Sequence, residues 1–226
     1  MALFALVPSF AQEAGEGQTL YGFVLGVGVN ADTQKYGFVK FNTSDLTKVD
    51  YLKTVTMWTP MVCAAEYLDG KIYAYTVDWN SDFGGYSSSA FEVYDATTFK
   101  TVSSVNRSSE QRVLDMAYDY ATNTMYALAE DAVSTKETTG ATSLCIVDLA
   151  TGKLTRVGSP DIPQATDGYN RLVNNTLITL AADNNGNLYA MSEYRYFFKL
   201  DKFTGKATQV GERHSLATDN QFQSMT

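Results

Sequence analysis

The sequence repeats itself at a constant step of 53 residues. Four short apolar runs each end in an acid or an amide, and these end residues are Asn42, Asp95, Asp148 and Asp201, each 53 positions after the last. A longer phrase, Thr-Gly-Lys leading to Val-Gly, occurs at Thr151–Gly158 and again at Thr204–Gly211, with the same step. A fixed period of this size is typical of chains built from repeated supersecondary units.

Each repeat contains four strand-like segments. One segment carries a tyrosine just after a turn-forming residue, and its copies are Leu20-Tyr21-Gly22, Ile72-Tyr73-Ala74, Met125-Tyr126-Ala127 and Leu188-Tyr189-Ala190. A further apolar run precedes three of these turns, at Met61–Ala65, Val113–Ala117 and Leu177–Ala181. Four antiparallel strands per repeat predict the blades of a β-propeller. A sandwich or solenoid is the alternative, but a sandwich rarely keeps a fixed step.

Composition agrees with an all-β chain. Aromatic residues make up 13% of the sequence, Gly occurs 16 times and Pro four times, which favours strands joined by tight turns. With 17 Lys+Arg against 25 Asp+Glu, the net charge is −8, so a nucleic-acid partner is not expected. The two cysteines, Cys63 and Cys145, fit no metal motif, and we expect free thiols.

The two ends of the chain allow different interpretations. Residues 1–17 resemble the back half of a secretory signal, with an apolar Ala2–Val7 and small residues at Ser9 and Ala11, followed by a polar tail. A short buried strand is the alternative. We expect an exported protein, periplasmic, cell-surface or extracellular, whose mature chain has no membrane-spanning segment.

The propeller domain is expected to span residues 18–226, with about four blades. The last residues, Phe222–Thr226, resemble the first strand of another repeat. This strand either closes a four-bladed ring beside the first repeat, or the chain is an arc of a larger propeller of about six to eight blades.

The first strand of each blade lines the channel of a propeller. Counting back four residues from Glu66, Asp119 and Asp183 gives the channel positions Val62, Asp115 and Thr179, with Ser224 as the fourth. One carboxylate among these residues does not make a metal cage, so no metal or cofactor is expected. Glu66, Asp119 and Asp183 are interpreted as turn-starting residues. The sequence has a single histidine, His214. A Ser-His-Asp triad could therefore form only with His214 as its histidine.

The connections between strands carry the candidate ligand-binding residues. The longer connections, at about 76–89, 129–142, 159–176 and 211–221, are expected on one face of the ring, where binding usually resides. The candidate residues on that face are Trp58, Trp79, Asp82, Tyr86, Tyr169 and Arg171. Exposed aromatic rings with amides suit stacking on sugars or peptide side chains. Packing of Trp58 and Trp79 between blades or under their loops is the alternative.

Two phrases, Ala117–Leu128 and Ile146–Leu154, resemble the repeats of exported bacterial β-propellers. The similarity is to the YVTN, quinoprotein-like and NHL-like propellers, including uncharacterised secreted Bacteroidetes-type proteins. It implies the fold and export, and it implies no catalytic residue.

These observations favour a non-catalytic exported propeller that binds a protein or a glycan through its long-loop face. The alternative is a hydrolase or lyase whose active site, with Asp115 in the channel, is completed by further blades. A third interpretation is a structural repeat module of a surface protein.

Overall fold

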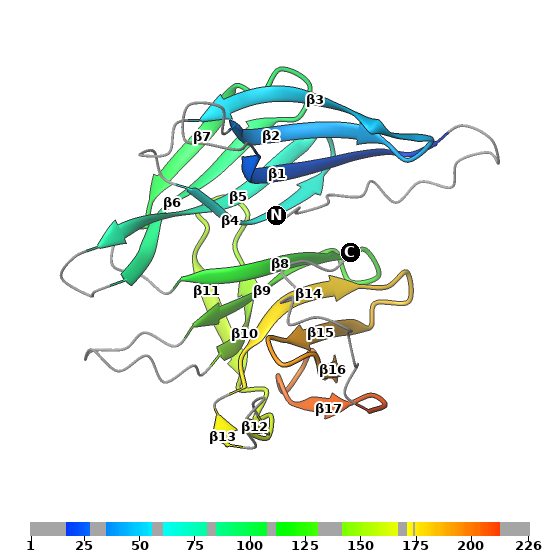
Figure 1. Ribbon diagram of the computed structural model, residues 1–226. Helices are drawn as coiled ribbons and strands as arrows, with labels where there is room; N and C mark the ends of the chain where they lie inside the picture. The colour runs from blue at the N-terminus through cyan, green and yellow to red at the C-terminus, as the bar shows by residue number, and fades with distance from the viewer. Residues whose placement is uncertain are drawn as a thin grey trace.

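The computed structural model describes residues 17–27, 35–55, 61–80, 85–107, 112–130, 142–166, 171–173 and 175–212. Every regular element in these ranges is a β-strand (Figure 1). Within them there is no helix that is long and apolar enough to cross a membrane.

The strands form four successive antiparallel sheets, one for each repeat. The first sheet has three strands, β1 (Thr19–Val27), β2 (Lys35–Asn42) and β3 (Asp45–Val55). The second has β4 (Met61–Leu68), β5 (Lys71–Asn80), β6 (Gly85–Asp95) and β7 (Thr101–Asn106). The third has β8 (Val113–Asp119), β9 (Thr124–Glu130), β10 (Thr142–Val147) and β11 (Leu154–Gly158). The fourth has β14 (Leu177–Ala182), β15 (Leu188–Ser192), β16 (Phe197–Leu200) and β17 (Ala207–Gln209).

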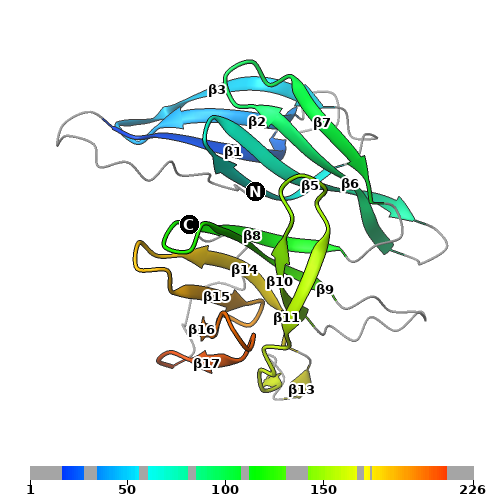
Figure 2. The same cartoon turned by 180° about the vertical axis from the view of Figure 1, so that it is seen from behind.

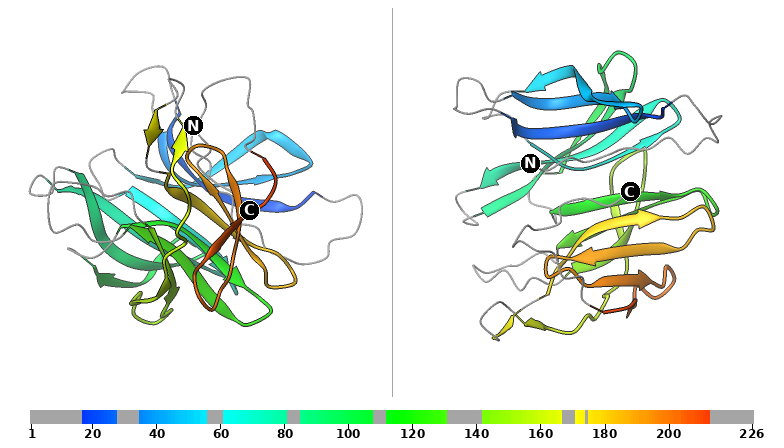
Figure 3. Two further views of the ribbon diagram at one scale, coloured as in Figure 1. Left: turned by 90° about the horizontal axis from the view of Figure 1, so that it is seen from below. Right: turned by 45° about the vertical axis from the view of Figure 1, so that its right-hand side comes forward.

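A small pair, β12 (Ala165–Thr166) and β13 (Leu172–Val173), lies between the third and fourth sheets along the chain. The four large sheets are arranged as the blades of a β-propeller and follow one another in chain order (Figure 3). Strands β4, β8 and β14 are the first strands of their blades, and β8 lies beside both of the others. The prediction of four-stranded blades is confirmed for three blades, and the first blade has three strands among the described residues. Phe222–Thr226 lies outside these residues.

The acid that marks each repeat is the start of a turn. Asp148 Oδ1 accepts hydrogen bonds from the backbone N–H groups of Ala150 (3.0 Å) and Thr151 (2.8 Å), directly after β10. Asp95 and Asp201 do the same one repeat earlier and one repeat later. A short carboxylate that bonds its own backbone two or three residues on is a standard way to start a turn. The 53-residue step is therefore the spacing of these turns.

The Thr-Gly-Lys phrase has a second role, because its glycine contacts the preceding blade. Gly152 has a φ of +66°, and a Cβ there would meet the ring of Phe91 in the second blade. The hydroxyl of Tyr75 donates a 2.5 Å hydrogen bond to the Gly152 carbonyl. Figure 2 shows the β10–β11 hairpin reaching the second sheet. Gly205 repeats this contact against the backbone of Gly158.

The core lies between neighbouring blades. Tyr75, Phe91 and Met125 are among the fully buried residues between the second and third blades, and Leu128, Leu177 and Leu188 among those between the third and fourth. Each interface buries apolar side chains from both sheets, which is the main stabilising contribution to such a stack.

Candidate functional site

The register of the first two strands of each blade identifies the equivalent positions. Ala64, Asp115 and Thr179 lie opposite Tyr75, Leu128 and Met191, which are equivalent residues of β5, β9 and β15. In each blade a register shift precedes this position, at Cys63, Leu114 and Ile178. The prediction of Val62 as a member of this set is therefore wrong, and Ala64 takes its place.

The error came from the turn that follows β4. In the second blade β4 runs to Leu68, and only Asp69 and Gly70 separate it from β5. In the third blade β8 ends at Asp119, and 120–123 form a longer turn. Glu66 is thus not equivalent to Asp119 and Asp183, because it lies inside the strand and opposite Tyr73. Its equivalents are Ala117 and Ala181, so the predicted turn role of Glu66 is wrong.

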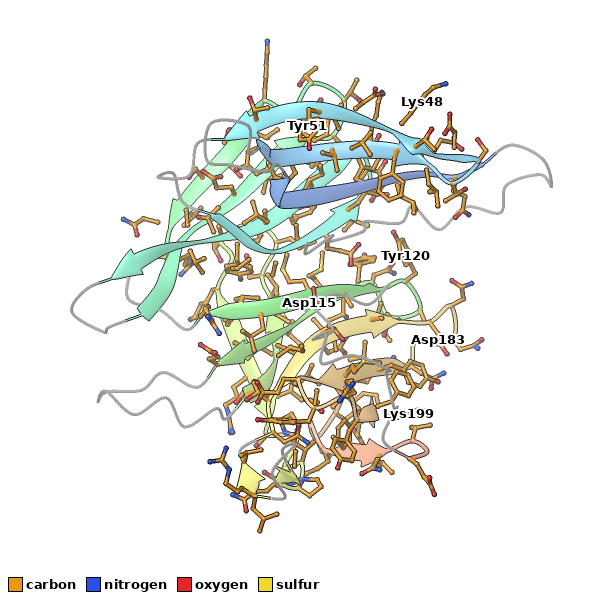
Figure 4. All side chains as sticks on the ribbon, in the orientation of Figure 1. Lys48, Tyr51, Asp115, Tyr120, Asp183 and Lys199 are labelled. Atoms are coloured by element: carbon orange, nitrogen blue, oxygen red, sulfur yellow. The ribbon has the colours of Figure 1, made fainter. Side chains whose placement is uncertain are left out.

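Asp115 joins the third and fourth blades. Its Oδ1 accepts a 2.9 Å hydrogen bond from the N–H of Met116, the next residue of β8, and its Oδ2 accepts a 2.8 Å bond from the N–H of Leu180 on β14. The side chain is buried, at 4% exposure. Burial raises the pKa of Asp115 to about 8, although both N–H groups favour the charged form. Asp115 lies on β8, away from the turns that carry Tyr120 and Asp183 (Figure 4).

Glu66 makes the same connection one blade earlier. Its Oε1 accepts a 3.0 Å hydrogen bond from the N–H of Tyr67, the next residue of β4. The N–H of Tyr118 on β8 also bonds to it and favours its charged form. Burial first, and then the charge of Asp115, raise the pKa of Glu66 to about 8. The two carboxyl groups therefore interact, and each binds an N–H of its own strand and one of the next blade.

Sequence reasoning found Asp115 but missed the role of Glu66. The available signal was a single acid within the apolar run Met61–Leu68. Thr179, the other predicted channel residue, is fully buried, and its hydroxyl accepts a 3.3 Å hydrogen bond from the N–H of Met191 in the same blade. Thr179 thus makes a contact within its blade, whereas the two acids join neighbouring blades.

Asp119 and Asp183 start turns, as predicted. Asp183 accepts hydrogen bonds from the N–H groups of Asn185 (2.9 Å) and Asn187 (2.8 Å). Asp119 caps its turn similarly and also forms an ion pair with Lys202 of the fourth blade, with 2.6 Å between Oδ2 and Nζ. Burial alone would raise the pKa of Asp119, but the hydrogen bonds from Lys202 and the turn hold it below the ordinary value.

Tyrosines pack at equivalent positions of two successive blade interfaces. The rings of Tyr21 and Tyr67 are stacked across the first and second blades, with centroids 5.7 Å apart. Tyr73 and Tyr118, at the equivalent positions one blade later, both pack against the cluster between the second and third blades. Burial, followed by the charge of Asp69, raises the pKa of both these tyrosines. Their place in the repeat shows a packing role.

The candidate loop residues are only partly described. Trp79 and Tyr86 lie opposite one another in the register of β5 and β6, near the end of the hairpin. The expected loop over 76–89 is therefore mostly strand, with only 81–84 between β5 and β6. Arg171 is exposed just before β13. Trp58, Asp82 and Tyr169 lie outside the described residues, as do Ser224 and His214.

The two cysteines are free, and the thiol of Cys63 is not activated. Cys145 is buried and Cys63 is half-buried, and both are free. Burial raises the pKa of Cys63 to about 12, although the nearby Arg112 lowers it slightly, so the nucleophilic thiolate is disfavoured. In the part of the chain that the structure describes, no group of three or more His, Cys, Asp and Glu side chains is placed to hold a metal ion.

Comparison with known proteins gives structural neighbours only. No family model matches the chain, and no curated protein sequence matches it. The computationally designed Ika4 protein is 12% identical, with a TM-score of 0.42, and the match covers 78% of this chain and 86% of that one. The designed Ika8 protein is 11% identical, with a TM-score of 0.44 and coverage of 98% and 64%.

A natural neighbour is the β-propeller domain of Cps50 (Swd1) from Myceliophteria thermophila. It is 13% identical, with a TM-score of 0.44, and the match covers 84% of this chain and 55% of that one. At this level of similarity neither activity nor partner transfers. The chain is an all-β protein with a four-blade β-propeller arrangement, and this assignment follows from its own sheets and their repeat.

Proposed function

We propose that this chain is a non-catalytic propeller that binds a protein or a glycan through the connections opposite its tight turns. The observation that carries the proposal is the register of β5 and β6, which brings Trp79 and Tyr86 opposite one another near the end of a long hairpin. Directly opposite residues are the closest cross-strand neighbours in an antiparallel pair. Two aromatic residues at such positions, on a scaffold held by four sheets, fit a stacking surface for a sugar ring or a peptide side chain.

The remaining candidate residues extend this surface in the proposal. Trp58, Asp82, Tyr169 and Arg171 belong to connections that the repeat assigns to the same end of the blades. Aromatic and Arg side chains are the residue types that dominate the energetics of binding surfaces. A glycan or an extended peptide is the ligand class that such a surface would recognise.

The test is a glycan array and a peptide array probed with the full chain, followed by titration of the best ligand. The Trp58→Phe variant leaves Trp79 as the only tryptophan, so its fluorescence reports ligand contact. We expect Trp79→Ala and Tyr86→Ala to weaken binding by at least about tenfold each. Phe203→Ala, which removes an aromatic side chain that is 82% exposed on the fourth blade, is the matched control. Binding that survives replacement of Trp58, Trp79 and Tyr86 contradicts the proposal.

A second candidate function is a hydrolase or lyase, with Asp115 as an acid–base group. The interaction between Asp115 and Glu66 favours it, because two carboxyl groups with raised pKa values are suited to proton transfer near neutral pH. A panel of glycoside, ester and lactone substrates tests it. Turnover that is lost in Asp115→Asn supports this function, and turnover that is unaffected excludes Asp115 from the chemistry.

We also propose that the protein is exported and belongs among the secreted bacterial propellers that its repeat phrases resemble. The support is the apolar Ala2–Val7 followed by small residues at Ser9 and Ala11. N-terminal sequencing of the protein recovered from the periplasm or medium is the test. A new N-terminus at Gln12 is the expected result, and full-length protein confined to the cytoplasm contradicts it.

A further inference from the structure

Glu66 and Asp115 occupy related places in two successive blade interfaces. Each carboxyl group binds the backbone N–H of the next residue in its own strand and one backbone N–H of the following blade. Glu66 of the second blade accepts the N–H of Tyr118 in the third blade, and Asp115 of the third blade accepts the N–H of Leu180 in the fourth. The two groups therefore link three blades in series along β4, β8 and β14.

We propose that Glu66 and Asp115 form a proton-controlled clasp between the second, third and fourth blades. With protons bound, the buried Asp115 and the half-buried Glu66 sit in their interfaces without charge, and the interfaces stay closed. Loss of the protons places two interacting negative charges among apolar side chains, and opening of the interfaces then allows the carboxylates to be hydrated. The clasp is independent of the ligand-binding function proposed above.

Among the described residues, no cation around Glu66 and Asp115 neutralises their charge. The titratable groups on the elements packed around the clasp are Cys63, Tyr67, Lys71, Tyr73, Tyr75 and Asp78 of the second blade, Arg112, Tyr118, Asp119, Tyr126 and Glu130 of the third, and Tyr189 and Lys202 of the fourth. Lys202 is paired with Asp119, and Arg112 is paired with Glu130. The charged group that acts on Glu66 is Asp115. Strand β14 contributes no titratable side chain between Leu177 and Ala182.

The direction of the pH effect follows from the two pKa values. Both groups have a folded pKa of about 8, against ordinary values of 3.8 and 4.5. Between these limits the folded chain holds protons that the unfolded chain releases. The stability that the groups contribute is therefore present in acid, decreases as the pH rises, and is lost above about pH 8.

The experiment is urea unfolding of the full chain between pH 5 and pH 9 at constant ionic strength. We expect the unfolding equilibrium constant of the wild type to increase by at least about tenfold per group between pH 5 and pH 8. The variants Glu66→Ala and Asp115→Thr remove one group each and should each reduce this increase. They use residues that the chain itself has at the equivalent positions, Ala117 and Thr179, so the fold tolerates them there.

Two controls separate the clasp from other groups that titrate in this range. Glu193→Gln removes a half-buried carboxyl whose pKa burial also raises, and His214→Gln removes the only histidine. Both should leave the contribution of the clasp intact. A wild-type unfolding constant that stays level or falls between pH 5 and pH 8 overturns the proposal. The proposal is also overturned if the unfolding constant of the double variant Glu66→Ala/Asp115→Thr rises between pH 5 and pH 8 as much as that of the wild type.

Amide hydrogen exchange gives a local measurement. The N–H groups of Tyr118 and Leu180 bond to the two carboxyl groups across the interfaces. After correction for the intrinsic exchange rate, their protection in the wild type should fall by at least about tenfold between pH 6 and pH 9. Protection that is independent of pH contradicts the clasp even if global stability changes.

Discussion

Acidic side chains behave in opposite ways at the tight turns and on the first strands of the blades. Asp95, Asp148 and Asp201 start turns at the surface, and hydrogen bonds from the turn hold their pKa values below the ordinary range. Glu66 and Asp115 also accept backbone N–H groups, but burial raises their pKa values to about 8. Similar hydrogen bonds therefore stabilise a charge at the turns and do not overcome the cost of burying it between blades.

Asp119 sharpens this comparison because it is fully buried and yet held in its charged form by Lys202. Replacement of Asp119 by Ala leaves Lys202 without its partner, at only 17% exposure, and should lower the free energy of unfolding by about 3 kcal/mol. Urea unfolding at pH 7 measures this change. Asp183→Ala, the equivalent turn acid of the fourth blade, is the control and should have a smaller effect. Equal losses in the two variants would show that the ion pair contributes nothing.

The turns differ among themselves in how closely the preceding blade approaches. Gly205 has a φ of +75°, and a Cβ there would lie 2.7 Å from the carbonyl carbon of Gly158. Gly70 has the same φ but open space around it. We expect Gly205→Ala to cost about 2 kcal/mol and Gly70→Ala about 1 kcal/mol. Thermal unfolding of both variants gives the difference, and a larger loss for Gly70→Ala would contradict the close approach.

Tyr75 connects the two regions, because its buried hydroxyl donates to the carbonyl of Gly152 in the next blade's turn. Tyr75→Phe removes the donor and keeps the ring, so it should lower the free energy of unfolding by about 1 kcal/mol. Tyr51→Phe, a half-buried tyrosine at the outer strand of the first blade, is a comparison variant. An unchanged stability in Tyr75→Phe would mean that the Gly152 carbonyl finds another donor.

The smallest expected effect concerns the exposed turn acids at low pH. Their lowered pKa values contribute stability above about pH 4 that is lost as the pH falls through the folded values. Asp148→Asn keeps a side-chain acceptor for the turn and removes one titrating group. Its urea unfolding midpoint should therefore fall less between pH 5 and pH 2 than that of the wild type. Glu66 and Asp115 have the opposite effect, because their contribution to stability decreases as the pH rises above 5. The two effects together predict a stability maximum near pH 5. A second maximum near pH 8 would break the comparison.

The repeat made most of the fold predictable. The 53-residue step, the tyrosine phrase and the Asp-initiated turns are local patterns, and all three correspond to strands and turns at the expected places. The candidate site was less predictable, because it depends on register. Asp115 and Thr179 are equivalent in the register of their blades, as predicted, but Val62 was taken for Ala64 since the β4–β5 turn is two residues shorter than its counterpart.

The sequence by itself determined the 53-residue repeat, the order of strands and the aspartates that start turns, such as Asp95, Asp148 and Asp201, because these depend on short segments of chain. It did not show that Glu66 lies inside a strand, because that depends on the length of the following turn. Tertiary structure decided which carboxyl groups meet an N–H of the next blade and which meet a lysine. Asp119 and Asp115 are four residues apart on one strand, yet one lies beside Lys202 and the other among apolar side chains. Contacts between blades set the environment of each acid, and that environment, not the residue type, fixes its charge.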